Sequence, residues 1–189
     1  MYEDKLKKAF DAFSLSSAED WSDYDEYCEE KNYPKGTIIK KPNTCGKYFY
    51  FIIEGSIGVF LWNSDNYICT GFAFENNFFG DYVSILTGDP SPIEIIALED
   101  TKVLRISRND YLKLGETPDG NQFLRIAAEA TLINLQQHQI DLLSKTAEQR
   151  YKEMLTNKPI LVKRVVQKHL ASYLGVTPQS LSRIRKHID

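Results

Sequence analysis

The end of the chain carries the pattern that most restricts how it can fold. Residues 165–188, VVQKHLASYLGVTPQSLSRIRKHI, hold two short helical runs on either side of a glycine. The apolar positions of the first run recur at helical spacing, at Val166, Leu170, Ala171 and Leu174. Gly175 suits the left-handed backbone that ends a helix, Thr177 can cap the next helix, and Pro178 suits its first turn. The pattern predicts two helices joined by a tight turn.

The second run separates apolar from polar side chains. Leu181 and Ile184 are three residues apart and are expected to face inward, and the small Ala171 lets the two helices cross closely. The side chains left outside are Gln179, Ser180, Ser182, Arg183 and Lys186. This pattern is typical of a helix-turn-helix, whose second helix enters the major groove of DNA, and the alternative is a purely structural helical hairpin.

The distribution of charge favours the DNA-binding alternative. The formal net charge is −3, but residues 158–189 hold seven Lys or Arg and one acidic residue, so that segment carries +6 and residues 1–157 carry −9. A basic end beside an acidic body marks where a polyanion would dock.

The composition is otherwise that of an ordinary globular protein. With 189 residues, of which 42% are hydrophobic and 26% charged, we expect one or two domains with a sizeable core. No run approaches the roughly 18 apolar residues of a membrane span, and residues 1–10 lack the apolar segment of a secretory signal. We therefore expect a cytoplasmic protein without a membrane partner. Cys28, Cys45 and Cys69 lack CxxC spacing, which predicts reduced, mostly buried thiols rather than disulfides or a metal site.

Short β-type runs alternate with turn residues through the first half of the chain. They fall at 37–39, 48–53, 56–62, 67–74, 93–98 and 102–107. Runs at about ten-residue intervals predict an antiparallel sandwich or barrel. Short helices are expected at 82–86 and, capped by residues 108–110, up to Leu114. Two packing helices are expected before the strands, at 3–13 and from about 17 to 30.

Residues 119–145 read as one long helix with two apolar stripes. The stripes are Leu124, Ala128, Thr131, Leu135, His138 and Leu142, and Phe123, Ile126, Ile133 and Ile140. One face can lie on the barrel, and the other can pair with the same helix of a second chain; the alternative is a core helix of a single chain. A further helix at 147–156 and a hinge at 157–159 lead into the basic end.

In this order, the motifs resemble those of the CRP/FNR family of bacterial transcription regulators, named after the cyclic-AMP receptor protein and the fumarate–nitrate reduction regulator. The matching motifs are Pro34-x-Gly36, Tyr50-x-Ile52-x-x-Gly55-x-Ile57, Phe79-Gly80-Asp81, the long helix and the terminal helix-turn-helix. The resemblance implies an α+β fold in three parts. These are a cyclic-nucleotide-binding-like antiparallel β-barrel (a double-stranded β-helix) with N-terminal helices at 1–115, a long dimerisation helix at 116–145, and a helix-turn-helix domain at 146–189.

The chain departs from the family pattern where a cyclic nucleotide would bind. Family members that bind one carry Phe-Gly-Glu, whose acid holds the ribose hydroxyl, and an Arg-Ser/Thr-Ala motif, whose arginine pairs with the phosphate. Here the acid is Asp81, one methylene shorter, and Ser91 stands at the arginine position. Ser91 cannot make the charged bidentate contact, and the following Pro92 has no N–H to donate. We predict weak or no binding of cyclic AMP.

The resemblance also implies partners. It predicts a homodimer, joined through residues 119–145, that binds a near-palindromic operator in double-stranded DNA, with RNA polymerase as a further candidate partner. Gln179 and Arg183 are the predicted base-reading residues, since Gln suits adenine and Arg suits guanine. The predicted phosphate contacts are Lys168, Ser180, Ser182, Arg185 and Lys186. Family members usually continue into a β-hairpin wing, whereas this sequence stops at Asp189, so we expect weaker or more dimer-dependent binding.

No cofactor is required by this interpretation, and the sequence does not specify an effector. An effector would lie between the barrel and the long helix, near Asp81, Tyr82 and Ser91. One alternative is a small-molecule-sensing barrel whose C-terminal helix pair docks a protein rather than DNA. An enzyme or a metal-binding barrel is disfavoured, because His138, His169 and His187 all lie outside the predicted barrel.

Overall fold

The strands of the computed structural model, which describes residues 27–63 and 66–188, form two four-stranded sheets. Their orders are β1-β8-β3-β6 and β2-β7-β4-β5, and every pairing is antiparallel. The strands are β1 (Cys28–Tyr33), β2 (Ile38–Lys40), β3 (Tyr48–Glu54), β4 (Ile57–Asn63), β5 (Asn66–Ala73), β6 (Phe78–Phe79), β7 (Ile93–Ala97) and β8 (Thr101–Ser107). The predicted antiparallel barrel is confirmed.

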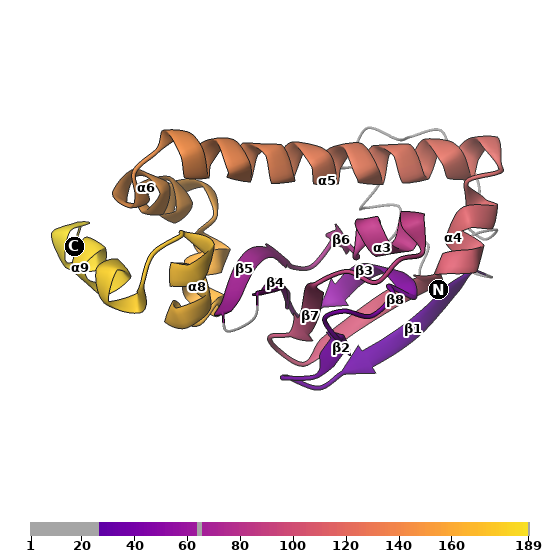
Figure 1. Ribbon diagram of the computed structural model, residues 1–189, viewed down its shortest axis with the longest axis horizontal. Helices are drawn as coiled ribbons and strands as arrows, with labels where there is room; N and C mark the ends of the chain where they lie inside the picture. Colours follow the sequence, from indigo (N-terminus) through magenta and orange to yellow (C-terminus); the bar gives the residue numbers. More distant parts are fainter. Residues whose placement is uncertain (1–26, 64–65, 189) are drawn as a thin grey trace.

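One long helix, α5, separates the helices at the barrel from a second group of helices near the C-terminus (Figure 1). The helices are α3 (Tyr82–Thr87), α4 (Arg108–Leu114), α5 (Pro118–Ser144), α6 (Ala147–Asn157), α7 (Pro159–Arg164), α8 (Gln167–Tyr173) and α9 (Pro178–Ile188). Helix α5 starts beside α4 at the barrel and runs the length of the molecule to α6, while α6 to α9 gather beyond the β4–β5 end of the barrel (Figure 1).

Strand β3 is buried on both faces because its large side chains alternate. Tyr50 and Ile52 face the second sheet, together with Ile57 and Ile95. The opposite face of β3 lies under the helices and packs against α3, α4 and the first turns of α5. The buried residues on that side are Phe49, Phe51, Ile85, Leu104, Ile106, Tyr111, Leu114, Phe123, Leu124 and Ala127. Alternation with a period of two thus supplies two cores from one strand.

Two glycines occupy backbone positions that a side chain would strain. Gly55 turns β3 into β4 at φ +94°, and a Cβ there would approach the Asp100 carbonyl oxygen to 2.5 Å. Gly175 ends α8 at φ +70°, as the sequence predicts, and Val176 then donates its N–H to the Ala171 carbonyl at 2.9 Å. The second arrangement is a helix C-cap that turns the chain tightly into α9.

Helices α6 to α9 share a core of their own. It consists of Tyr151, Met154, Leu161, Val165, Leu170, Ala171, Leu174 and Leu181, joined by Phe74 from the barrel. Thr177 caps α9 by accepting a hydrogen bond from the Ser180 N–H at 3.2 Å, which confirms the predicted cap. The helix-turn-helix geometry therefore follows the sequence pattern closely.

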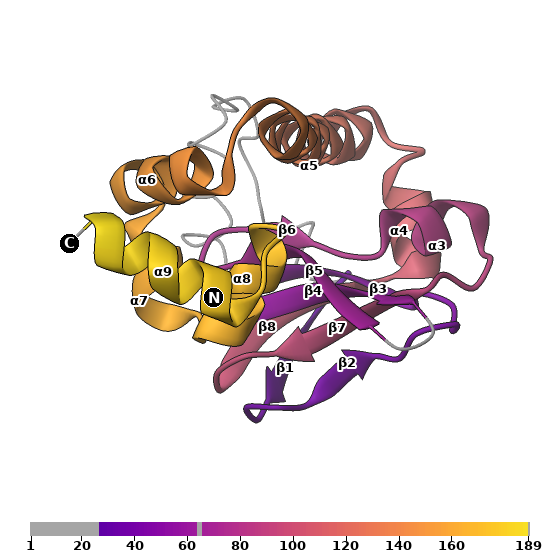
Figure 2. The same cartoon turned by 60° about the vertical axis from the view of Figure 1, so that its left-hand side comes forward.

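The two apolar stripes of α5 are buried only near its start. Phe123, Leu124 and Ala127 pack on the barrel. Farther along, large apolar side chains lie at the surface: Leu132, Ile133, Leu135, Ile140, Leu142 and Leu143. The view along α5 in Figure 2 shows the helix lying over the barrel.

Several sequence predictions are wrong. Residues 28–30 belong to β1 rather than to a helix, because Cys28 to Glu30 pair with Leu104 to Ile106 of β8. Tyr27 lies in a turn, and the rest of the two predicted N-terminal helices lies outside the described residues. Val166 is exposed and its neighbour Val165 takes the inward position, since α8 begins only at Gln167.

Three smaller differences concern local structure. The helix α7 occupies residues read as part of a hinge and the segment after it. The cap of α4 is Ser107, whose hydroxyl accepts the Asp110 N–H at 3.1 Å, rather than residues 108–110. Finally, Cys45 is exposed, whereas Cys69 is buried and Cys28 half-buried, so the prediction of mostly buried thiols does not hold for Cys45.

Candidate functional site

Asp81, the acid expected to meet a ligand, is held by the protein itself. It follows β6 and caps α3, where its Oδ1 accepts the Ser84 N–H at 3.2 Å. Its Oδ2 accepts a hydrogen bond from the Ser91 hydroxyl, so the structure brings these two predicted site residues together. Both are buried, with 5% and 4% of their surface exposed. The carboxylate is therefore part of an internal polar cluster.

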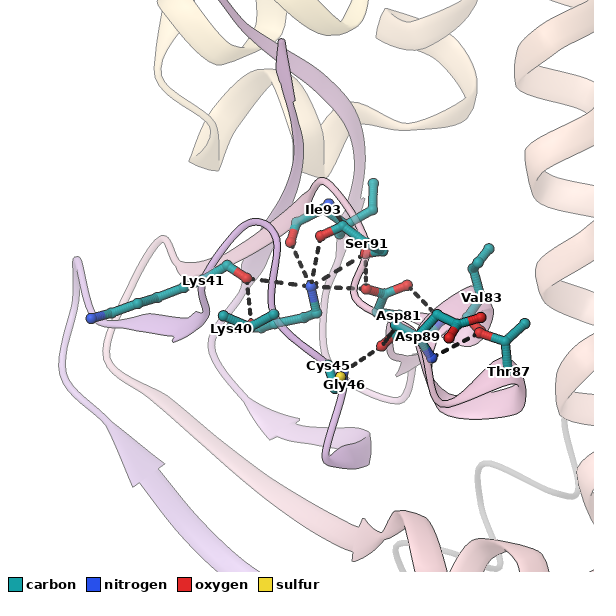
Figure 3. Close-up of polar contacts among 12 residues, drawn as sticks. Lys40, Lys41, Cys45, Gly46, Asp81, Val83, Thr87, Asp89, Ser91 and Ile93 are labelled. Carbon is teal, nitrogen blue, oxygen red and sulfur yellow. Dashed lines mark hydrogen bonds and ion pairs between the residues drawn. The ribbon is translucent and has the colours of Figure 1, made fainter. Parts of the chain in front are cut away.

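The centre of this cluster is Lys40, from β2. Its ammonium lies 2.9 Å from Asp81 Oδ2, and only 6% of the lysine side chain and 2% of the aspartate side chain are exposed. The ammonium also donates to the Ile93 carbonyl at 2.8 Å and to the Ser91 hydroxyl at 3.3 Å. Further contacts go to the carbonyls of Lys41 and Ser91 (Figure 3). A buried cation is tolerated only when paired and hydrogen-bonded in this way.

Sequence reasoning missed Lys40. A usable signal was present, because Lys40 is a charged residue at an inward position of a short strand. Such a residue needs a buried partner, and Asp81 was the acid already expected inside the barrel. The partner could not be assigned from the sequence, since Lys40 and Ser91 are brought together by the pairing of β2 with β7 and the bridge between Thr44 and Ser91, and Asp81 comes from the cap of α3.

Tyr82, the third predicted ligand-binding residue, packs against the core beneath α5. Its ring packs edge-on against Phe49 with centroids 5.2 Å apart, and it belongs to the core beneath α5. Burial raises the pKa of its hydroxyl, so the group stays protonated at neutral pH. Tyr82 therefore lies between the barrel and α5, as expected, but it is not part of the Lys40 cluster.

The predicted base-reading residues lie on the uncovered side of α9. Gln179, Arg183 and Lys186 are exposed and follow one another at helical spacing of four and three residues, so they share a face. Ser182 lies half-buried beside them, and Lys168 is exposed in the first turn of α8. The helices that carry these groups, α8 and α9, lie at the end of the molecule distant from α4 (Figure 1).

Two predicted phosphate contacts are engaged within the protein. Arg185 turns toward α6, where its Nε donates to the Tyr151 hydroxyl at 2.9 Å and its guanidinium lies 5.8 Å from that ring's centroid. The Ser180 hydroxyl lies 3.0 Å from the Thr177 hydroxyl within the cap of α9. Arg185 thus joins α9 to α6, whereas Ser180 lies at a helix N-terminus, which also offers free N–H groups.

The described residues contain no helix that is both long and apolar enough to cross a membrane. In the same parts of the chain, His, Cys, Asp and Glu side chains nowhere gather in groups of three or more that could hold a metal ion.

Residues 30–117 match the family model described as the cyclic nucleotide-binding domain. This segment covers the two sheets and the helices α3 and α4, so the barrel of the structure is that domain. A search of curated proteins gives no match to the chain.

Solved structures of several regulators share the fold over most of the chain. FixK2 from Bradyrhizobium japonicum aligns with a TM-score of 0.73 at 20% identity, covering 85% of this chain and 84% of that one. The c-di-GMP responsive global regulator CLP of Xanthomonas campestris gives 0.69 at 17% identity, covering 86% and 87%. The catabolite activator protein of Thermus thermophilus gives 0.55 at 21% identity, covering 91% and 84%. The fold expected from the resemblance to the CRP/FNR family is confirmed, because the chain shares the fold of these solved structures.

We expect Lys40→Met to destabilise the protein by about 3–5 kcal/mol, because the substitution leaves the buried Asp81 carboxylate without its counter-charge. The measurement is urea unfolding. Lys41→Met is the matched control: the neighbouring Lys41 is exposed, and its replacement should change the free energy of unfolding by about 0.5 kcal/mol or less. Adding Asp81→Asn to Lys40→Met should recover part of the loss. Equal stability of the Lys40 and Lys41 variants would contradict the assigned pair.

Proposed function

We propose that the protein is a homodimeric DNA-binding transcription regulator of the CRP/FNR type, acting in the cytoplasm, whose barrel does not bind cyclic AMP in the usual way. The observation that carries the proposal is the uncovered face of α9, which presents Gln179, Arg183 and Lys186 from a helix-turn-helix on this fold. In that arrangement the second helix enters the major groove.

The mechanism of recognition follows from that face. The two recognition helices of a dimer enter successive major grooves about 34 Å apart and read a near-palindromic operator. Gln179 and Arg183 read base edges, while Lys168, Ser180, Ser182 and Lys186 hold phosphates. The contact of Arg185 with Tyr151 supports a positioning role for Arg185 besides any phosphate contact. RNA polymerase is the further partner that such a regulator would meet on DNA.

Dimerisation through residues 119–145 is supported by the uncovered part of α5. Ile133 and Ile140 are 66% and 54% exposed, and Leu132 and Leu143 lie near them on the same helix at 54% and 81%. A helix that leaves this many large apolar side chains at the surface buries them against another surface, and two copies of α5 at coiled-coil spacing provide it.

The Lys40 cluster supports the proposal for the barrel. In the family the acid at the Asp81 position holds a ribose hydroxyl; here both of its oxygens are engaged by the protein, Oδ1 by Ser84 and Oδ2 by Lys40 and Ser91. A nucleotide would have to displace the Lys40 ammonium from a site with almost no exposed surface. The Lys40 ammonium thus occupies the place beside Asp81 that a bound ligand would take. Any effector acts elsewhere on the barrel.

The decisive experiment is selection from a random DNA pool at low salt, with and without cyclic AMP. We expect a two-fold palindrome to be enriched equally in both arms, and isothermal titration to detect no low-micromolar cyclic AMP site. Enrichment only with the nucleotide would overturn the proposal for the barrel. No enrichment in either arm would favour a helix pair that docks a protein.

Arg183→Ala should relax the preference for one base pair in each half-site by roughly 1–3 kcal/mol, because a bidentate contact to a guanine edge is lost. The measurement is a competition titration against operators changed at single positions. Lys113→Ala removes a basic side chain paired with Asp110 on α4 and is the control. If Arg183→Ala weakened binding equally on every sequence, Arg183 would be a phosphate contact.

Replacing Ile133 and Ile140 together with Glu should convert the dimer to a monomer at micromolar concentration, because like charges then meet across the apolar seam. Analytical ultracentrifugation measures the change. Leu112→Glu, at an exposed apolar position on α4, should leave the dimer intact. A dimer that survives the double substitution would place the interface outside this part of α5.

A further inference from the structure

The DNA-binding end is fastened to the barrel by Arg164, the last residue of α7. Its Nη1 and Nη2 donate to Glu75 at 2.7 and 2.8 Å, and its Nε donates to Glu99 at 3.0 Å. Nη2 also contacts the second oxygen of Glu99. Glu75 follows β5 and Glu99 follows β7, so one guanidinium joins two separate turns of the barrel. We call Arg164, Glu75 and Glu99 the clamp.

The barrel side of the clamp is itself fixed in place. Glu75 Oε1 also accepts the Gly55 N–H at 2.9 Å, which ties this carboxylate to the β3–β4 turn. The Arg164 guanidinium lies 5.0 Å from the centroid of Phe74, the barrel residue that joins the core of α6 to α9. A planar guanidinium with two carboxylates in its plane and an aromatic ring beside it is held in one orientation.

The charges of the clamp persist at neutral pH. The hydrogen bonds from Arg164 lower the pKa of Glu75 to about 2, and they also lower the pKa of Glu99. Because the pKa of Glu75 is lower in the folded protein than in the unfolded chain, its stabilising contribution is present above the ordinary glutamate range. That contribution is lost only as the pH falls toward about 2. The clamp is therefore a permanent joint and not a switch for physiological pH.

A second set of contacts holds α8 along the edge of β5. The Cys69 N–H donates to the Ser172 hydroxyl at 2.8 Å. The Tyr173 ring lies between Phe72 of β5, with centroids 5.2 Å apart, and His138 of α5, stacked at 4.1 Å. The helix-turn-helix thus contacts both the barrel and the far half of α5 through these side chains.

These contacts leave the face of α9 that carries Gln179 and Arg183 exposed. Helix α9 packs on α8 and α6, and its Gln179 and Arg183 side chains are exposed while the clamp is closed. The Arg164 donors point at barrel carboxylates, so this arginine does not take part in the basic surface offered to DNA. The clamp is therefore compatible with DNA binding, and it affects only the orientation of α9.

We propose that the clamp sets the orientation of α9 relative to α5, and thereby the separation of half-sites that the dimer accepts; Arg164 is a positioning residue for operator recognition. The inference rests on the proposed DNA-binding function. In a dimer joined along α5, the distance between the two recognition helices depends on how each helix-turn-helix is attached to its own barrel and helix. The clamp is the attachment that bridges the barrel to the segment directly before α8.

The test uses the full chain and the palindrome enriched by selection, with the two half-sites moved apart or together one base pair at a time. A duplex with a single half-site is included. The wild type is expected to prefer one spacing. Arg164→Gln should reduce affinity for that spacing by about 10-fold, a typical size for energetic coupling between sites. It should bind neighbouring spacings nearly as well, and it should bind the single half-site like the wild type.

Glu99→Gln removes a clamp partner located in the barrel and should flatten the spacing preference in the same direction. Arg164→Lys keeps the charge without the two-pronged geometry and should fall between wild type and Arg164→Gln. Lys113→Gln breaks the exposed Lys113–Asp110 pair within α4, outside the proposed dimer and DNA contacts, and should change nothing. Far-UV circular dichroism and thermal unfolding establish that each variant is folded. If Arg164→Gln does not fold, the spacing preference of Glu99→Gln tests the positioning role.

The outcomes separate the two proposals. If the wild type enriches no palindrome, the DNA-binding function itself fails. If the wild type discriminates between spacings and the folded clamp variants discriminate equally well, the positioning role is overturned. A uniform loss of affinity, including on the single half-site, would also overturn it, because Arg164 would then contact phosphate or merely support the fold.

Discussion

Strand β3 must bury both of its faces, and the rest of the molecule is arranged around that requirement. Tyr50 and Ile52 are covered by the second sheet, which closes the barrel. Phe49 and Phe51 are covered by α3, α4 and the first turns of α5. The long helix is therefore pinned to the barrel at its start. Its later apolar side chains are exposed within the described part of the chain, and they form the face assigned to a second copy in the proposed dimer.

Local patterns predicted the elements well where a single segment determines its own structure. The turn at Gly175, the cap at Thr177 and the inward Leu181 follow from short-range stereochemistry, and all three are present. The order of motifs was enough to predict the fold. The first strand was mistaken for a helix because its structure depends on pairing with β8, far along the chain, and not on its own apolar spacing.

The polar interior was less accessible to such reasoning. Asp81 and Ser91 were recognised as special positions, but their partner Lys40 comes from a different strand, and its local pattern does not say which acid it meets. The residues of the clamp are likewise far apart in the sequence. Glu75 and Glu99 are separated by 24 positions, and Glu99 and Arg164 by 65. Buried ionic groups are specified by the tertiary structure that brings them together, and their pairing cannot be read from spacing alone.

The length of α5 gives small angular changes a large effect. The helix has 27 residues, which at 1.5 Å per residue makes it about 40 Å long. A tilt of about 5° at the barrel would move its far end by about 3.5 Å, close to the 3.4 Å rise of one base pair of DNA. In the proposed dimer, the spacing of half-sites would be read reliably only if the far end of this helix is held in place. The contacts of Arg164 and Tyr173 with the barrel provide that support, so the part of the molecule at the far end of α5 is also attached to the barrel directly.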